Sequence, residues 1–202
     1  MPSLPVAVPY DHATLAAALT AHGACRLPGF QDIIATQALR LELQHRQATG
    51  DLKAAGTGQG TGHRGINTSR GDSTQWLEAD GSLAATAYLA ALHDLRLSLN
   101  RHLFLGMQEV EAHFACYPIG ACYLRHRDRF KGSESRVLSL VTYLSEDWQA
   151  AQGGALRLYL PQGPVDVLPQ AGMTVCFLSE TEHEVLPATR ERLSIAAWMR
   201  AR

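Results

Sequence analysis

The sequence has no surplus of charge of one sign and no hydrophobic run near the length of a membrane span. Its 202 residues include 18 Lys and Arg against 19 Asp and Glu, which leaves a net charge of −1. Proteins that bind nucleic acid usually carry a basic surplus, so we expect no nucleic-acid partner. A transmembrane helix needs about 20 mainly apolar residues, so we expect no membrane partner either.

Cysteine is scarce, and a secretion signal is missing. The four cysteines, Cys25, Cys116, Cys122 and Cys176, form no C-x-x-C pair. The N-terminal sequence MPSLPVAVPYDH has no basic region followed by an apolar run, as a secretory signal would. Unpaired thiols suit a reducing compartment. We therefore predict a cytoplasmic protein whose cysteines are small core residues.

Several common catalytic motifs are absent as well. The sequence contains no G-x-x-x-x-G-K-[ST], no G-x-S-x-G and no H-E-x-x-H. Gly60, Gly62 and Gly65 match G-x-G-x-x-G, but no strand pattern precedes them and no helical pattern follows. Nucleotide-binding and nucleophilic-serine functions therefore lose most of their support.

The first half of the chain shows helical periodicity. Apolar residues recur at spacings of three and four, as in Ile34, Ala38 and Leu41. These patterns predict helices over residues 11–22, 32–48 and 84–103. The glycine-rich stretch 56–72 follows the second of them and is either a flexible linker or a mobile loop beside a site.

The second half consists of short β-rich runs separated by Gly and Pro turn signals. We expect strands over 109–117, 121–127, 136–144, 155–160, 164–168, 173–178, 182–187 and 191–199. This spacing predicts an α+β fold with a double-stranded β-helix (jelly-roll) core and N-terminal helices packed on one sheet. The prediction is a single domain, 1–202, with a helical support region of about 1–105 and a jelly-roll core of about 106–202.

Residues His126 and Asp128 stand two apart in a β-prone segment, so a strand would direct both side chains to one face. By itself such a pair is more often a surface feature than a ligand pair. His183 changes this interpretation, since a jelly-roll can return a late strand beside an earlier one. Two histidines and a carboxylate on one face of iron(II) leave three positions open. The alternative for His183 is a surface histidine among acids.

A strand over 191–199 would place Arg192, Ser194, Ala196 and Trp198 on one face. A guanidinium beside small side chains suits a pocket for a small dicarboxylate, because Arg can grip one carboxylate with two hydrogen bonds. The alternative is an exposed Arg192 that pairs with Glu191 or solvent.

Tyr143 ends an inward row of smaller residues, Val137, Ser139 and Val141. A buried phenol needs a hydrogen-bond partner, so this row indicates a polar end to the pocket. The alternative is a plain core tyrosine whose hydroxyl bonds to backbone.

The order H-x-D, a distant His and a closely following Arg resembles the iron(II)- and 2-oxoglutarate-dependent dioxygenases. More closely, the chain resembles the prolyl hydroxylases that act on hypoxia-inducible factor and their bacterial relatives. The matching blocks are RGDSTQWLE at 70–78, ACYP at 115–118, YLRHRD at 123–128, TYLSEDW at 142–148, GGALRLY at 153–159 and HEVLPATRERLSIAAW at 183–198.

This resemblance implies roles for individual residues. The iron ligands would be His126, Asp128 and His183, and these three with Arg192 would form the catalytic centre. The cosubstrate 2-oxoglutarate would lie against Arg192, Tyr143, Tyr117 and Trp198. The implied substrate-binding residues are Arg70, Asp72, Trp76 and Arg136, with an Asp72–Arg136 ion pair that ties the glycine-rich loop, a candidate lid, to the barrel mouth.

The implied activity is that of an oxidoreductase, a peptidyl-proline 4-hydroxylase that uses Fe(II), 2-oxoglutarate and O2 and is stimulated by ascorbate. The expected partner is a protein with a target proline, and a translation factor such as elongation factor Tu is one candidate. One alternative is the same chemistry on a free amino acid or other small molecule. Another is a non-enzymatic jelly-roll module that binds a metal or ligand. Nucleic-acid demethylation is disfavoured by the charge balance.

Overall fold

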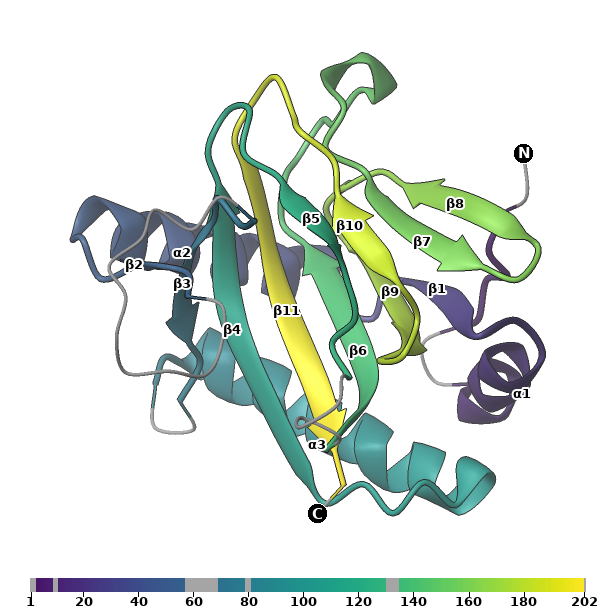
Figure 1. Cartoon of the computed structure of the whole chain (residues 1–202). Coiled ribbons are helices and arrows are strands. Elements are labelled where there is room, and N and C mark those ends of the chain that lie inside the picture. Colours follow the sequence, from purple (N-terminus) through teal and green to yellow (C-terminus); the bar gives the residue numbers. More distant parts are fainter. Residues whose placement is uncertain (1–2, 9–10, 57–68, 79–80, 130–134, 202) are drawn as a thin grey trace.

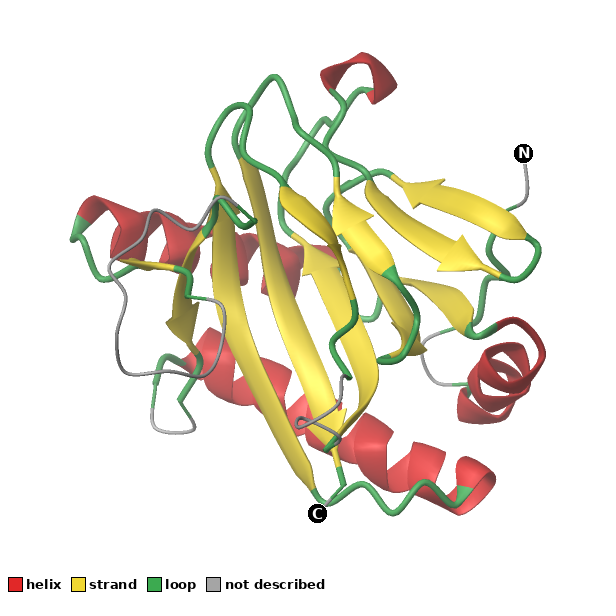
Figure 2. Ribbon diagram, viewed as in Figure 1, coloured by secondary structure: helices red, strands yellow, loops and turns green. Residues whose placement is uncertain are grey.

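Two antiparallel sheets face each other, and helices cover the outer face of the larger sheet (Figures 1 and 2). The computed structural model describes residues 3–8, 11–56, 69–78, 81–129 and 135–201. This arrangement confirms the predicted α+β fold with a jelly-roll core and N-terminal helices on one sheet.

Within the described ranges, the larger sheet has seven strands and the smaller has four. The larger sheet runs in the order β1 (Ala24–Pro28), β9 (Met173–Leu178), β6 (Arg136–Tyr143), β11 (Arg192–Arg200), β4 (Glu109–Tyr117), β3 (Ser73–Trp76) and β2 (Lys53–Ala54). The smaller sheet runs in the order β5 (Tyr123–His126), β10 (His183–Val185), β7 (Leu156–Leu160) and β8 (Gly163–Val167). All eight strands expected in the second half of the chain are present, with ends that differ by no more than a few residues.

Helices form where the periodicity predicts them. They are α1 (His12–His22), α2 (Ile33–Ala48) and α3 (Leu83–Leu103), and a short 3-10 turn follows later at Ala150–Gln152. Each α-helix begins after a capping side chain, as Asp32 shows by accepting a hydrogen bond from the Ala35 N–H at 2.7 Å. Of the helices described, none combines the length and hydrophobicity needed to cross a membrane.

The apolar positions named for α2 prove to lie on the wrong face. Ile34 and Leu41 are exposed, whereas Leu39 and Leu43 are fully buried against the sheet. The helix carries two apolar stripes, so periodicity alone could not choose the one that packs. The choice comes from the sheet and from α3, which buries Leu92, Leu95 and Leu99 in the same cluster.

Strand β11 separates the two sides of the larger sheet. Its residues Leu193, Ile195, Ala197 and Met199 join the core beneath the helices. The alternate residues Arg192, Ser194, Ala196 and Trp198 point between the sheets, as the alternation predicts, and line a cavity there. The inner face of the larger sheet therefore carries these polar side chains beside a second hydrophobic cluster, which includes Ala115, Val175 and Phe177.

Three strands of the larger sheet were not predicted. Strand β1 pairs with β9 through Cys25 and Cys176 and forms one end of the sheet, while β2 and β3 extend the other end beyond β4. Each is two to five residues long and shows no clear alternation, so its pairing is decided by neighbours distant in sequence. The first hundred residues thus supply strands as well as helices.

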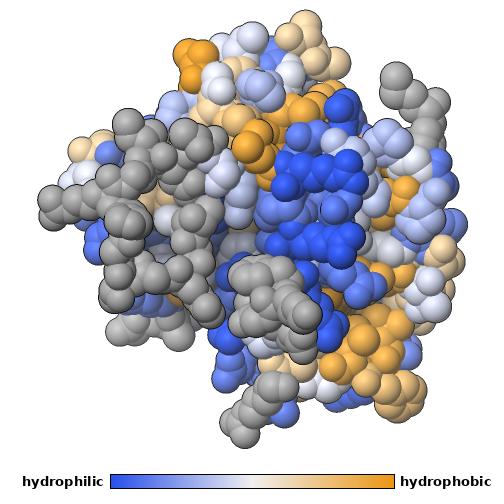
Figure 3. Space-filling view, in the orientation of Figure 1, coloured by the Kyte–Doolittle hydropathy of each residue, from blue (hydrophilic) through white to orange (hydrophobic). Residues whose placement is uncertain are grey.

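The four cysteines are free thiols. Cys25, Cys116 and Cys176 are buried, as predicted, whereas Cys122 is half-buried. Polar residues gather over the outer face of the smaller sheet, which no helix of the described chain covers (Figure 3). Oppositely charged side chains meet across its strands there, as Arg157 and Asp166 do at 2.7 Å.

Candidate active site

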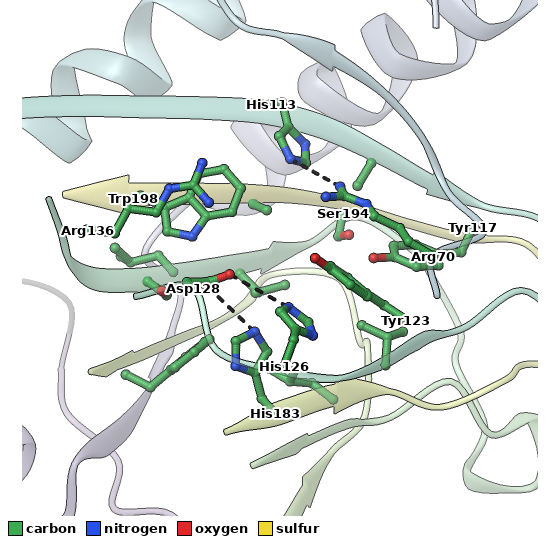
Figure 4. Close-up of a pocket in the computed structure, with 18 of the residues that line it drawn as sticks. Arg70, His113, Tyr117, Tyr123, His126, Asp128, Arg136, His183, Ser194 and Trp198 are labelled. Atoms are coloured by element: carbon green, nitrogen blue, oxygen red, sulfur yellow. Dashed lines mark hydrogen bonds and ion pairs between the residues drawn. The ribbon is translucent and has the colours of Figure 1, made fainter. Parts of the chain in front are cut away.

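Three potential metal ligands, His126, Asp128 and His183, converge between the sheets (Figure 4). One ligand atom from each lies within 4.8 Å of the others. The Nε2 atoms of His126 and His183 lie 3.7 Å and 3.6 Å from the two carboxylate oxygens of Asp128. His126 and His183 are direct cross-strand partners in β5 and β10, which explains how residues far apart in sequence meet.

Asp128 reaches this cluster from outside the strand. β5 ends at His126, and Asp128 lies in the bend that follows, so the prediction of one strand carrying both residues is wrong in this detail. The bend is held by a hydrogen bond from the Arg129 N–H to the Ser179 carbonyl at 2.9 Å. The hydroxyl of Ser139 donates to Asp128 Oδ2 at 2.7 Å and fixes the buried carboxylate.

Hydrogen bonds also fix both imidazoles. Nδ1 of His126 lies 2.7 Å from the Leu124 carbonyl oxygen, and Nδ1 of His183 lies 2.9 Å from that of Thr181. A carbonyl can only accept, so each Nδ1 carries the hydrogen and each Nε2 presents its lone pair to the cluster. Histidines that bind metals are usually oriented in this way.

The electrostatics keep His126 and Asp128 in the metal-binding form. Burial, helped by the nearby His183, lowers the pKa of His126 to about 4, so its imidazole is neutral at neutral pH. Burial alone would raise the pKa of Asp128, but His183 and His126 lower it more, so it stays below the ordinary value. Two imidazoles, of which that of His126 is neutral, and one carboxylate fit a divalent metal such as iron(II).

Arg192 is buried in the same space and is not fully satisfied. Its Nε donates to the Gly154 carbonyl at 3.1 Å and its Nη1 to Ser194 Oγ at 3.0 Å. Nη2 is buried and has no hydrogen-bond partner in the described chain. With an exposed fraction of 1%, Arg192 is not the surface arginine of the alternative interpretation.

Tyr143 presents a second unsatisfied group beside Arg192. Its hydroxyl is buried and has no hydrogen-bond partner among the described residues, so it is not a core tyrosine bonded to backbone. The guanidinium carbon of Arg192 lies 5.2 Å from the Tyr143 ring centroid. Burial raises the pKa of Tyr143 to about 12, which keeps the phenol protonated and able to donate. Buried polar groups normally have partners, so both atoms indicate a site for an anionic ligand.

An inner cavity of about 70 Å³ is lined by the metal ligands and by Arg192; Tyr143 is not among its lining residues and lies behind Arg192. Tyr117 and Trp198 line it, as expected, together with apolar side chains such as Leu156 and Phe177. The fit to 2-oxoglutarate is therefore chemical: the cavity combines a buried cation, Arg192, with apolar walls and the metal ligands, and the Tyr143 phenol lies beside that cation.

An outer cavity of about 410 Å³ opens beside the inner one. The two share Asp128 and five further lining residues, Arg70, His113, Tyr123, Arg136 and Trp198. Trp76 lines the outer cavity and is half-exposed. The shared lining residues place the outer cavity directly beside the metal ligands.

The Asp72–Arg136 ion pair expected from the resemblance is not formed. Instead, Arg70 binds the buried Asp72 carboxylate with two hydrogen bonds of 2.6 Å and 2.8 Å. Arg136 lies 2.7 Å from Glu111 and stacks over Trp198, with its guanidinium carbon 3.7 Å from the ring centroid. The reason is geometric, because Arg70 and Asp72 are two residues apart, and the backbone bridge between Arg70 and Tyr123 holds Arg70 beside the cavity.

The candidate lid lies mainly outside the described residues, since 57–68 are not included in them. Its described end, from Ser69 to Gly71, pairs with the edge of β5: the Leu124 N–H donates to the Ser69 carbonyl at 2.9 Å, and the Gly71 N–H to the Cys122 carbonyl at 3.0 Å.

Several site residues were not singled out from the sequence. Ser139 belonged to the inward row of β6, and Tyr123 to the block YLRHRD, so each carried a signal that was not used. His113 carried none: it precedes a buried phenylalanine in a strand and is recognised only when Trp76 and Trp198 close around it at ring-centroid distances of 5.2 Å and 5.1 Å.

Comparison with known proteins agrees with this geometry. Residues 112–200 match the 2OG-Fe(II) oxygenase superfamily. Human Egl nine homolog 1 is 32% identical over 142 residues, 64% of this chain and 32% of that protein, so the chain spans about a third of its length. Mouse prolyl hydroxylase EGLN3 is 30% identical over 168 residues, 78% of this chain and 68% of that protein. The solved structure of a Pseudomonas putida prolyl-4-hydroxylase is 43% identical with a TM-score of 0.86, and the match covers 95% of this chain and 99% of that one.

Proposed function

The chain belongs to the 2OG-Fe(II) oxygenase superfamily, and from this membership we infer that it is an Fe(II)- and 2-oxoglutarate-dependent dioxygenase that hydroxylates a prolyl residue in a protein substrate. The finding that carries the inference is the pairing of a complete His126–Asp128–His183 ligand set with the buried, unpartnered Nη2 of Arg192 in one cavity.

His126, Asp128 and His183 would hold the iron through two Nε2 atoms and one carboxylate oxygen. When bound, iron(II) with 2-oxoglutarate and O2 supplies the oxidation that converts a C–H bond to C–OH and releases succinate and CO2. The protein orients the ligands through the Leu124 and Thr181 carbonyls and through Ser139.

Arg192 and Tyr143 would bind the distal carboxylate of 2-oxoglutarate. Nη2 of Arg192 and the Tyr143 hydroxyl are both buried donors without a partner in the described chain, so a carboxylate would satisfy them together. Apolar residues such as Leu156 and Phe177 line the same cavity and would exclude water from the methylene groups of bound 2-oxoglutarate.

A prolyl residue of a protein is the favoured substrate for two reasons. Two of the relatives are prolyl hydroxylases by name. The outer cavity is also much larger than the inner one, and Asp128 and Trp198 are among its lining residues. An extended peptide could lie in it with one side chain directed to the metal.

Elongation factor Tu is one candidate substrate, and hydroxylation at C4 of the prolyl ring is the expected outcome. A free amino acid or another small molecule would instead use the inner cavity without contacts along the outer one. A protein that merely binds metal or ligand would form no succinate.

The test is to incubate the purified protein with iron(II), 2-oxoglutarate, ascorbate and a cell extract, and to search by mass spectrometry for one added oxygen on proline. Purified elongation factor Tu is assayed in parallel, with and without ascorbate, which we expect to stimulate turnover. Hydroxyproline that requires 2-oxoglutarate supports the proposal. Succinate formed only with free amino acids would overturn the proposal of a protein substrate. The absence of succinate under every condition would overturn the proposal that the protein is an enzyme.

A further inference from the structure

We propose that Tyr123 is a positioning residue that sets the plane of the His126 imidazole, and that Arg70 clamps Tyr123 from its other side. The inference rests on the proposed metal site and deepens it. Figure 4 shows Tyr123 between the guanidinium of Arg70 and the ring of His126.

The contact between Tyr123 and His126 is close and nearly parallel. Their ring centroids lie 3.6 Å apart, and the ring planes differ by 16°. The plane of the imidazole is set by rotation about its Cβ–Cγ bond. The hydrogen bond from His126 Nδ1 to the Leu124 carbonyl restrains this rotation, but a single hydrogen bond still tolerates part of it. A flat neighbour removes this freedom, so the hydrogen bond and the stacked ring together determine where Nε2 points.

His126 needs this support more than His183 does. His183 is buried in β10, which is paired on one side with β5 and on the other with β7, and Phe177 packs against its ring at 4.8 Å. His126 is the last residue of β5, the outermost named strand of the smaller sheet, and its side chain is 17% exposed. Without Tyr123, one face of its ring would lose its packing, and the hydrogen bond to Leu124 and the contacts with His183 and Asp128 would remain.

Arg70 completes the clamp. Its guanidinium carbon lies 4.8 Å from the centroid of the Tyr123 ring, within the range of a cation–π contact. Arg70 is held in turn by the protein: its Nε and Nη2 bind the carboxylate of Asp72, and Nη2 lies 3.5 Å from Nε2 of His113. The Arg70 side chain is 13% exposed and that of Asp72 is fully buried, so the guanidinium has little freedom to leave Tyr123.

Backbone pairing holds the same parts together. Arg70 and Tyr123 form an antiparallel bridge, flanked by the hydrogen bonds from Leu124 to Ser69 and from Gly71 to Cys122. A Cβ atom on Gly71 would lie 3.1 Å from that of Ala121, so the two segments are in tight contact. Backbone pairing therefore keeps Arg70 against Tyr123 in the folded state, and both residues belong to the lining that the two cavities share.

The test measures metal binding by the apo protein, independently of any substrate. Calorimetry gives the affinity for Co(II), and the visible spectrum of bound Co(II) reports the ligand geometry. Tyr123→Leu keeps apolar bulk but loses the flat ring, so we expect Co(II) affinity to fall by about tenfold or more and the spectrum to change, as for other outer partners of metal ligands. Tyr123→Phe keeps the ring and should restore both.

Arg70 is tested with Arg70→Met/Asp72→Asn, which removes both charges and leaves no buried ion unpaired. We expect a loss of Co(II) affinity of about threefold to tenfold, smaller than that of Tyr123→Leu, since the ring stays but is less restrained. The matched control is Arg125→Met. Arg125 lies on the same strand and stacks over Tyr159 at 3.7 Å, on the exposed side of the sheet, so its loss should leave Co(II) affinity and spectrum unchanged.

Wild-type affinity and an unaltered Co(II) spectrum in a folded Tyr123→Leu protein would overturn the inference. So would an equal loss in Tyr123→Phe, which would assign the effect to the hydroxyl. The proposed function fails separately, through the absence of hydroxyproline, and that result would leave the metal-binding comparison intact.

Discussion

His126 and His183 lie directly opposite each other on neighbouring antiparallel strands, with ring centroids 4.2 Å apart. The smaller sheet therefore builds most of the metal site by strand pairing, and Asp128 completes it from the adjoining bend. A shift of one residue in this register would turn one imidazole to the opposite face of the sheet.

Asp128→Ala should remove iron binding and turnover together, because two imidazoles alone hold a labile divalent ion poorly. Calorimetry with the apo protein and succinate release measure the two effects. Asp166→Ala is the control, since Asp166 is a half-exposed carboxylate paired with Arg157 on the outer side of the same sheet. Full iron affinity in Asp128→Ala would contradict the proposed ligand set.

Arg192→Lys should raise the KM for 2-oxoglutarate by about tenfold or more, because a lysine cannot reproduce a two-point grip on a carboxylate. Metal affinity without cosubstrate should change little. Arg190→Lys is the neighbouring control: Arg190 lies over Trp148, away from the cavity, and should leave the KM unchanged. An unaltered KM in Arg192→Lys would refute the assigned role.

Tyr143→Phe should raise the KM for 2-oxoglutarate by about threefold to tenfold, the equivalent of one hydrogen bond. It should not lower the free energy of unfolding, since the hydroxyl has no partner in the described chain. Tyr88→Phe makes the same deletion where the hydroxyl binds Thr142 Oγ1 at 2.9 Å, and it should cost about 1 kcal/mol. Urea denaturation compares the two, and destabilisation of Tyr143→Phe would indicate a partner within the protein.

Asp72→Ala should destabilise the protein by about 3 kcal/mol, because it leaves the largely buried guanidinium of Arg70 without its carboxylate partner. Arg136→Ala should cost about 1 kcal/mol or less, since Arg136 and Glu111 are both partly exposed. A double-mutant cycle for Asp72 and Arg136 should give a coupling energy near zero. Coupling above about 1 kcal/mol would mean that the ion pair expected from the sequence forms after all.

Acid should weaken the folded protein through His113. Burial, with a contribution from Arg70, lowers the pKa of His113 to about 4, well below the ordinary value for histidine. Between pH 6.5 and 4 the unfolded chain binds a proton at His113 that the folded chain excludes. The free energy of unfolding is therefore unaffected above this window and falls as the pH falls through it. We expect a loss of about 3 kcal/mol at pH 4. The test compares the free energy of unfolding of the apo wild type and of His113→Gln at pH 7 and at pH 4. The wild type should lose more on acidification than the variant, and equal losses in the two proteins would contradict the assignment to His113.

Much of this organisation could be predicted because it depends on local patterns. The alternation in 191–199 placed Arg192 and Trp198 on one face, and that face does line the cavity. The eight later strands were recognisable because Gly and Pro turns separate them. Periodicity and spacing depend only on residues that are near one another in the sequence, so they can be recognised without knowledge of the fold.

What could not be predicted depends on contacts between distant segments. Leu39 and Leu43 of α2 are buried because of what lies beneath them, although Ile34 and Leu41 look equally suitable in the sequence. Arg136 is the partner expected for Asp72, whereas Arg70 is the partner found. Both arginines line the same cavity, and only the backbone geometry at Arg70 decides between them.

The segment from Ser69 to Trp76 has a consequence for the order of folding. Its first residues pair with β5 in one sheet and its last with β4 in the other, so it can dock only after both of those later strands are in place. An early part of the chain must therefore wait for a late part, which raises contact order and slows folding. The same dependence allows this segment to detach while the strands from β4 onward stay paired, so its amide hydrogens should exchange with solvent before those of β6 and β11.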